Sequence, residues 1–205
     1  YREGWLRFTA TLSEQGAISE MGRHVIKGLA DMVESPAGSL WLMDASGGFY
    51  AQSTCWNMPE TVATEEACSS FCKFLQTSGW IVNLEEYRAS QGRYLELTLP
   101  DWLVDLPNAW LVVPLPAGND MIGFVLSTAR TVMDVNWEIN DLLKTAGRQA
   151  GAFLGQMRAA EALLEVRKFD AFNRMSAFVV HDLKNIVAQL ALMLKNAERH
   201  RDKPE

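Results

Sequence analysis

The stretch AWLVVPLPAGNDMIGFVLS, residues 109–127, carries the clearest information about the fold of this chain of 205 residues. Two apolar runs, 109–115 and 121–127, are rich in β-branched and aromatic residues, and the connection between them contains Pro, Gly and Asp. Apolar runs on either side of turn residues are typical of two consecutive antiparallel strands. The stretch therefore predicts a β-hairpin, and the elements around it decide which kind of sheet contains this hairpin.

Further strands are expected upstream. Residues 38–44 (GSLWLMD) and 49–56 flank a turn that contains two glycines, so they predict a second hairpin. Residues 80–84 predict another strand, and residues 94–99 a further short one.

Helices are expected on both sides of these strands. Residues 20–34 show an apolar stripe at helical spacing, with Ser19 as the expected N-cap. Glu65 and Glu66 favour the N-terminus of a helix over residues 64–77, which Gly79 should end. Two further helices are predicted, over residues 5–14 and from Val135 onward.

Composition and charge limit the classes of function. Hydrophobic residues make up 48% of the chain, with seven Trp and nine Phe, which is ample material for a core. A net charge of −6 and a pI near 5.2 argue against nucleic acid as a partner. No run of 18 uncharged apolar residues occurs, so we expect no membrane span. The chain starts at Tyr1 rather than Met, so we expect it to be a fragment.

The three cysteines form no metal-ligand pattern with the three histidines, so no metal site is expected. Cys68 and Cys72 are four residues apart on a predicted helix and could touch. The simplest interpretation is two buried thiols in a reducing compartment, and a redox pair is the alternative.

The order of two helices, hairpin, helix, strand, irregular loop, hairpin and long exit helix resembles a GAF domain. The residues that carry the likeness are SLWLM (39–43) and the paired VPL (113–115) and IGFVL (122–126). The resemblance implies an α+β fold, a GAF-like antiparallel sheet flanked by helices, followed by a long C-terminal signalling or coiled-coil helix. A PAS domain is the alternative, but it normally lacks the two leading helices.

GAF domains often bind a small molecule, so the resemblance implies that this domain could bind one too. The signatures of the cyclic-nucleotide and bilin classes are absent, and His24 is the only histidine available as a haem ligand in the GAF-like part. Five tryptophans could line a pocket or belong to the core: Trp41, Trp56, Trp80, Trp102 and Trp110. The ligand therefore stays unknown.

Apolar residues in the exit helix step by four and three, which is typical of a coiled-coil seam. They are Ala146, Ala150, Phe153, Met157, Ala160 and Leu164. The pattern predicts a parallel homodimer, and the alternative is an amphipathic helix that folds back on its own domain.

Residues 178–185 (FVVHDLKN) contain the only constellation that indicates a chemistry. On a helix His181 and Asn185 share a face, because they are four residues apart. Asp182 follows the histidine directly, so a nucleophilic imidazole has a carboxylate beside it.

This stretch resembles the H-box of sensor histidine kinases. The resemblance implies that His181 accepts phosphate from ATP, that Asp182 acts as base or orienting group, and that Asn185 orients water or phosphate during dephosphorylation. Most H-boxes continue with Pro, but here Ile186 follows, so the helix should not be kinked. The form HDLKN without Pro is similar to the PEP-CTERM/exosortase-associated sensor histidine kinases.

The two resemblances predict three parts: a GAF-like sensor domain (1–157), a signalling helix linker (158–174) and the truncated first helix of a dimerisation and histidine phosphotransfer domain (175–205). They imply a cytoplasmic fragment of a two-component kinase whose parent is anchored in the inner membrane, with a response regulator as partner. No cofactor is expected in this chain. ATP and magnesium would belong to a catalytic domain beyond Glu205, so the fragment alone should be inactive.

Two other classes of function stay open. One is a non-catalytic ligand-binding or dimerisation module whose H-box helix is not phosphorylated. The other is an enzyme that uses Cys55, Cys68 or Cys72 on the same scaffold.

Overall fold

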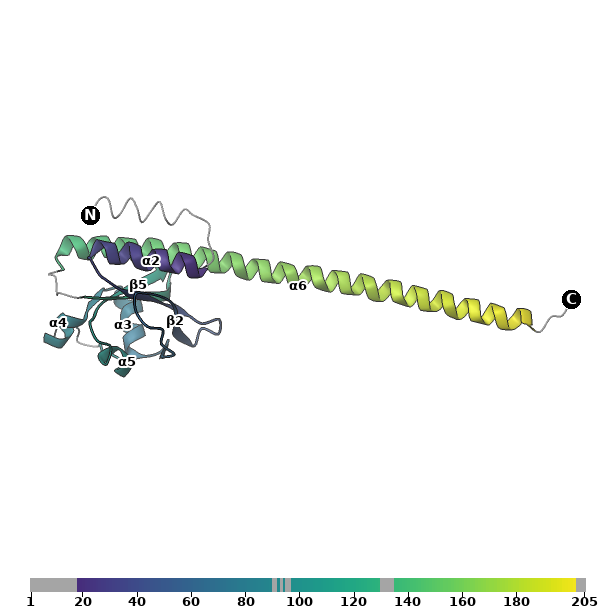
Figure 1. The fold of residues 1–205 in the computed structure, drawn as a ribbon, viewed down its shortest axis with the longest axis horizontal. Coiled ribbons are helices and arrows are strands. Elements are labelled where there is room, and N and C mark those ends of the chain that lie inside the picture. Colours follow the sequence, from purple (N-terminus) through teal and green to yellow (C-terminus); the bar gives the residue numbers. More distant parts are fainter. Residues whose placement is uncertain (1–17, 90–91, 93, 95–96, 130–134, 202–205) are drawn as a thin grey trace. The chain divides into compact units, whose positions relative to one another are not determined.

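The computed structural model describes residues 18–89, 92, 94, 97–129 and 135–201 (Figure 1). In chain order the elements are α2 (Ile18–Met32), β1 (Gly38–Met43), β2 (Phe49–Trp56), β3 (Thr64–Glu66), α3 (Ser70–Ser78), β4 (Val82–Asn83), α4 (Leu84–Ala89), α5 (Asp101–Val104), β5 (Ala109–Ala117), β6 (Asp120–Thr128) and α6 (Trp137–Arg201). The helix predicted over residues 5–14 lies outside the described residues.

The six strands form one sheet in the order β3-β2-β1-β6-β5-β4, and every neighbouring pair is antiparallel. Both predicted hairpins, β1–β2 and β5–β6, are present. In the second hairpin Val113 faces Val125 and Pro114 faces Phe124. The α+β class and the antiparallel sheet expected from the sequence are therefore confirmed.

Helices cover both faces of this sheet, so the domain has two apolar layers (Figure 1). Helix α2 and the first turns of α6 pack on one face, against Leu111 and Val113 of β5. Helices α3, α4 and α5 pack on the other face, against side chains such as Val112 and Phe124. Because successive side chains of a strand point to opposite faces, neighbouring residues of β5 contribute to different layers.

Three glycines bring α6 close to β5. Gly147, Gly151 and Gly155 follow one another at intervals of four on the side of α6 that contacts this strand. A Cβ on Gly147 would lie 2.7 Å from the carbonyl oxygen of Pro114, and one on Gly151 would lie 2.8 Å from the carbonyl carbon of Leu115. Only residues without a side chain allow the helix and strand backbones to approach this closely.

The predicted dimer seam is therefore wrong at its N-terminal end. Ala146 and Ala150 are fully buried in their own domain, beside Leu143 and Leu154. They cannot face a second chain, because β5 and α2 already cover this side of the helix. For these first turns the alternative, a helix that folds back on its own domain, is correct.

Three local expectations are wrong. Residues 64–66, expected to begin a helix, form β3, because they pair with residues 49–51 of β2. The helix begins at Ser70 instead, where the Ser69 hydroxyl accepts the N–H of Cys72 at 3.2 Å. Helix α2 begins one residue before Ser19, which is therefore not its N-cap.

Other expectations hold in part. Gly79 ends α3 as expected, with a φ of 60°. Of the predicted strand 80–84 only Val82 and Asn83 pair with β5. Within 94–99, the described residues Tyr94 and 97–99 are in no strand. Helix α6 begins at Trp137, two residues after the predicted start, and the Asn136 side chain accepts the N–H of Ile139 at 2.9 Å.

The chain divides into two compact units, Tyr1–Met157 and Arg158–Glu205. The second unit contains the C-terminal part of α6, and its helix continues through Ile186, where most H-boxes have Pro.

By length and composition alone, one described helix could cross a membrane. Between Trp137 and Asn196, α6 contains an 18-residue window with a mean hydropathy of 1.4. The expectation of no membrane span rested on the absence of a run of 18 uncharged apolar residues, which is a stricter criterion than a mean hydropathy. A single helix that passes the test is weak evidence, so it assigns no location.

The turn between β1 and β2 provides a first testable prediction. The Asp44 carboxylate accepts the N–H groups of Ser46 (2.9 Å), Gly48 (2.9 Å) and Phe49 (3.0 Å), and also the Ser46 hydroxyl. The bond from the Ser46 hydroxyl, followed by that from the Phe49 N–H, lowers the pKa of Asp44 from 3.8 to about 2. The group therefore stabilises the fold above pH 3.8, and this contribution is lost as the pH falls through about 2.

We expect Asp44→Asn to lower the urea midpoint of unfolding at neutral pH. Between neutral pH and about pH 2, the urea midpoint of this variant should fall by less than that of the wild type. Asp31→Asn, which removes an exposed carboxylate of α2, is the control. Equal acid sensitivity in the wild type and Asp44→Asn would contradict the assignment.

Candidate functional site

The three residues singled out in the sequence lie together on α6. The Asn185 Nδ2 atom is 3.2 Å from His181 Nδ1, and an Asp182 carboxylate oxygen is 3.6 Å from the same nitrogen. Both side chains reach solvent, with 73% of the His181 side chain and 51% of the Asp182 side chain exposed. An incoming reactant could therefore approach the imidazole.

The neighbours of the imidazole influence its tautomer. A carboxylate can only accept hydrogen bonds, so Asp182 favours a proton on His181 Nδ1. In that tautomer Asn185 would turn its amide so that the oxygen faces Nδ1. The second ring nitrogen, Nε2, would then be unprotonated and available as a nucleophile.

An apolar surface lies on the other side of the same helix. Five residues, spaced by three and four, are each 51% to 68% exposed: Val180, Leu183, Val187, Leu190 and Leu194. We call them the apolar face of α6. At about 100° per residue they centre roughly 140° away from His181 around the helix. A partner on the apolar face would therefore leave His181 accessible.

The tryptophans mostly belong to the core. Trp41 stacks between Trp102, with ring centroids 4.3 Å apart, and Phe124, at 5.6 Å. Trp110 is buried in the opposite layer. The interpretation as core is therefore correct for Trp41, Trp102 and Trp110.

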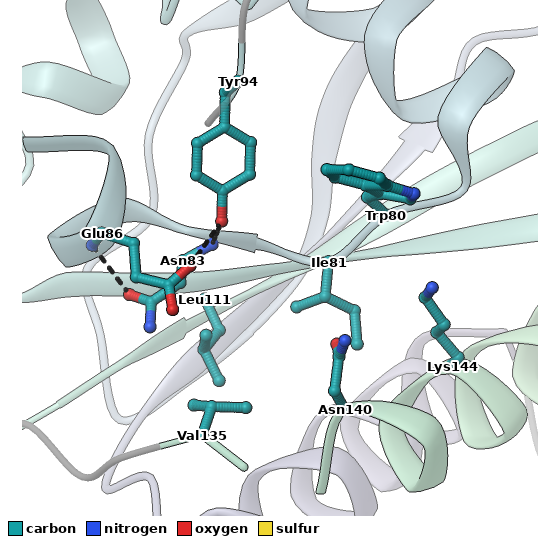
Figure 2. A pocket seen from close by; sticks show the side chains of 9 residues that line it. All are labelled: Trp80, Ile81, Asn83, Glu86, Tyr94, Leu111, Val135, Asn140 and Lys144. Carbon is teal, nitrogen blue, oxygen red and sulfur yellow. Dashed lines mark hydrogen bonds between the residues drawn. The ribbon is translucent and has the colours of Figure 1, made fainter. Parts of the chain in front are cut away.

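Trp80 instead lines a cavity of about 260 Å³ at the β4 edge of the sheet (Figure 2). The other lining residues are Ile81, Asn83, Glu86, Tyr94, Leu111, Val135, Asn140 and Lys144. Sequence reasoning missed all of them except Trp80. The available signal was Asn140 and Lys144, two polar residues four apart in the first turns of a helix that packs on the sheet.

The cysteines do not form a site in the described residues. Cys68 is exposed and precedes α3, so the expectation of two buried thiols on one helix is wrong for it. Cys72 is buried, and burial raises the pKa of its thiol to about 12. A thiol with a raised pKa is a poor nucleophile. No group of three or more His, Cys, Asp or Glu residues in the described part of the chain could hold a metal ion.

Comparison with solved structures identifies similar folds. The GAF domain of an Acinetobacter phosphoenolpyruvate-protein phosphotransferase has a TM-score of 0.59 and 15% identity, over 77% of this chain and 93% of that one. The GAF domain of a phosphoenolpyruvate-protein phosphotransferase from Coxiella burnetii has a TM-score of 0.60 and 13% identity, over 78% and 95%. Residues 122 to 287 of a methyl-accepting chemotaxis protein have a TM-score of 0.59 and 12% identity, over 76% of this chain and 99% of that one.

This chain therefore has the GAF fold, followed by the long helix α6. No family model matches its sequence. No curated protein matches it either.

Proposed function

We propose that this chain is the cytoplasmic sensor and phosphoacceptor part of a two-component sensor histidine kinase. The observation that carries the proposal is the exposed group of His181, Asp182 and Asn185, on the side of α6 opposite its apolar face. A phosphoacceptor needs an accessible imidazole on a helix that can also associate with other helices. A segment of a methyl-accepting chemotaxis protein has a similar structure, which supports a regulatory role for the GAF domain in front of that helix.

The proposed chemistry is one displacement at phosphorus. Nε2 of His181 attacks the γ-phosphorus of ATP, so an N–P bond forms while the bond to the bridging oxygen breaks and ADP leaves. The ring becomes positively charged, and Asp182 stabilises that charge through the Nδ1 proton. The phosphoryl group then passes from His181 to an aspartate of a response regulator. In the separate dephosphorylation of that regulator, Asn185 orients the water that attacks the aspartyl phosphate and releases inorganic phosphate.

ATP and magnesium would be bound by a separate catalytic domain, so no residue of this chain is assigned to them. The chain by itself is then a substrate and regulator of that domain. Its apolar face would meet a second copy of the chain, because residues at heptad spacing on one helix suit the same residues on another.

The test is phosphotransfer in trans. The chain is mixed with a separately produced catalytic domain of a sensor histidine kinase and ATP labelled on its γ-phosphate. We expect an acid-labile, base-stable label on the wild type, and at least about a hundredfold less on His181→Gln, because the nucleophile is gone. His24→Gln, which removes a histidine of the GAF domain, is the matched control and should keep the label.

Label of equal strength on His181→Gln would contradict the assignment. A chain that is dimeric and folded but takes up no label, even when joined to the following bundle helix, would favour the non-catalytic binding or dimerisation module.

A further inference from the structure

The polar residues of the cavity at the β4 edge come from two parts of the chain that are distant in the sequence (Figure 2). Asn83, Glu86 and Tyr94 come from β4, α4 and the loop that follows. Asn140 and Lys144 come from the first turns of α6. Figure 2 shows Glu86 and Lys144 at opposite ends, with Ile81 and Leu111 between them.

The wall at the α4 end is held in place by hydrogen bonds. The Asn83 side-chain oxygen accepts the N–H groups of Glu85 (3.1 Å) and Glu86 (3.4 Å) and so caps α4. The Tyr94 hydroxyl accepts the N–H of Asn83 at 3.2 Å and donates to the Glu86 carboxylate at 3.0 Å. A carboxylate has about four acceptor sites, so Glu86 can accept a further hydrogen bond from a ligand.

The wall at the α6 end has unused donors. Among the described residues, neither the Lys144 ammonium nor the Asn140 side-chain amide has a hydrogen-bonding or ionic partner. Both side chains are half-buried, and both line the cavity. A cation and an amide donor on the same half-buried wall are well suited to bind a carboxylate.

The middle of the cavity is apolar and aromatic. Ile81, Leu111 and Val135 contribute apolar surface, and the Trp80 ring lies edge-on to Tyr94 with centroids 6.5 Å apart. The volume of about 260 Å³ is below the ~300–1,000 Å³ of pockets for drug-sized ligands. The space therefore suits a molecule with one small ring rather than a nucleotide or a tetrapyrrole.

We propose that this cavity binds a small aromatic carboxylate with a hydrogen-bond donor at the far end of its ring, such as a hydroxyphenyl acid. Lys144 and Asn140 hold the carboxylate, Trp80 and Leu111 contact the ring, and Glu86 accepts the donor. A ligand held in this way ties the first turns of α6 to the sheet edge. Binding of the ligand does not depend on the phosphotransfer proposed for His181. Any influence of the ligand on His181 does rest on that proposed function.

The experiment is calorimetric titration of the whole chain with 4-hydroxyphenylacetate and 4-hydroxybenzoate. We expect at least one of them to bind with a Kd below about 1 mM. The neutral amide 4-hydroxyphenylacetamide and phenylacetate, which lacks the donor, should each bind at least about tenfold more weakly than the full acid.

Variants locate the site. Lys144→Met and Asn140→Ala should each weaken binding at least about tenfold. Lys73→Met, at an exposed residue of α3 outside the cavity, should leave the Kd unchanged. Unchanged far-UV circular dichroism and tryptophan fluorescence show that each variant is folded. The proposal is overturned if neither acid binds at millimolar concentration, or if both cavity variants bind as tightly as the wild type. Equal weakening by Lys73→Met would also overturn it.

Discussion

Replacing Gly151 by alanine should destabilise the GAF domain by about 2–3 kcal/mol. The added Cβ would lie 2.8 Å from the carbonyl carbon of Leu115, and closer still to the carbonyl oxygen of Pro116. Both are backbone atoms, so no side-chain rotation can relieve the clash, and α6 must move away from β5. The better helix propensity of alanine, worth about 1 kcal/mol, offsets only part of this cost.

The measurement is denaturant unfolding followed by tryptophan fluorescence. All seven tryptophans precede residue 158, so the signal reports on the first unit. Gly155→Ala is the matched control on the same side of the same helix. Its Cβ would meet only the Ala117 side chain, at 3.1 Å, so we expect an effect near zero. If Gly151→Ala is as stable as the wild type, the helix does not lie against β5 as described.

Glutamate at both Leu183 and Leu190 should convert the proposed dimer into a monomer. Both residues belong to the apolar face of α6 and are 55% exposed in the single chain. In a symmetric dimer each substitution would bring two like charges into the seam, and desolvation costs several kcal/mol per buried charge. Because 1.4 kcal/mol is tenfold in affinity, we expect the dimer Kd to rise at least about a hundredfold.

Sedimentation velocity over a concentration series measures this change. Leu192→Glu is the matched control: the same substitution on the same helix, at a residue that is 62% exposed but lies near His181 around the helix. It should leave the dimer intact. A wild-type chain that stays monomeric at all concentrations would refute the dimer, and loss of the dimer in Leu192→Glu would move the interface to the histidine side.

Much of the fold follows from local patterns. Apart from an irregularity between Ala109 and Leu111, the runs 109–115 and 121–127 alternate between the two layers. They also surround a turn, so their pairing is the simplest way to bury both faces. The spacing of His181 and Asn185 also decides their proximity, because residues four apart on a helix are neighbours. The expected length of α6 follows from the absence of Pro between Val135 and Asp202.

The sequence-based predictions failed where a segment's structure depends on pairing with a segment that is not its neighbour in the sequence. Glu65 and Glu66 are favourable at a helix N-terminus. In the structure, however, residues 64–66 pair with β2, and this pairing satisfies their backbone hydrogen-bonding groups. The side chain of Glu65 is buried there and accepts the indole N–H of Trp102 at 2.8 Å, a contact across 37 positions. Local propensity contains no information about such a partner.

The sequence by itself determined the two hairpins, 38–56 and 109–127, and the meeting of His181 with Asn185 on one helix face. Each depends on residues within a few positions of one another, where backbone geometry alone decides which side chains are neighbours. Only the tertiary structure decided that Ala146 and Ala150 face β5 rather than a second chain, and that Asn83 and Asn140 line one cavity. Those arrangements require segments distant in sequence to pack together, and the packing depends on the shapes of both surfaces.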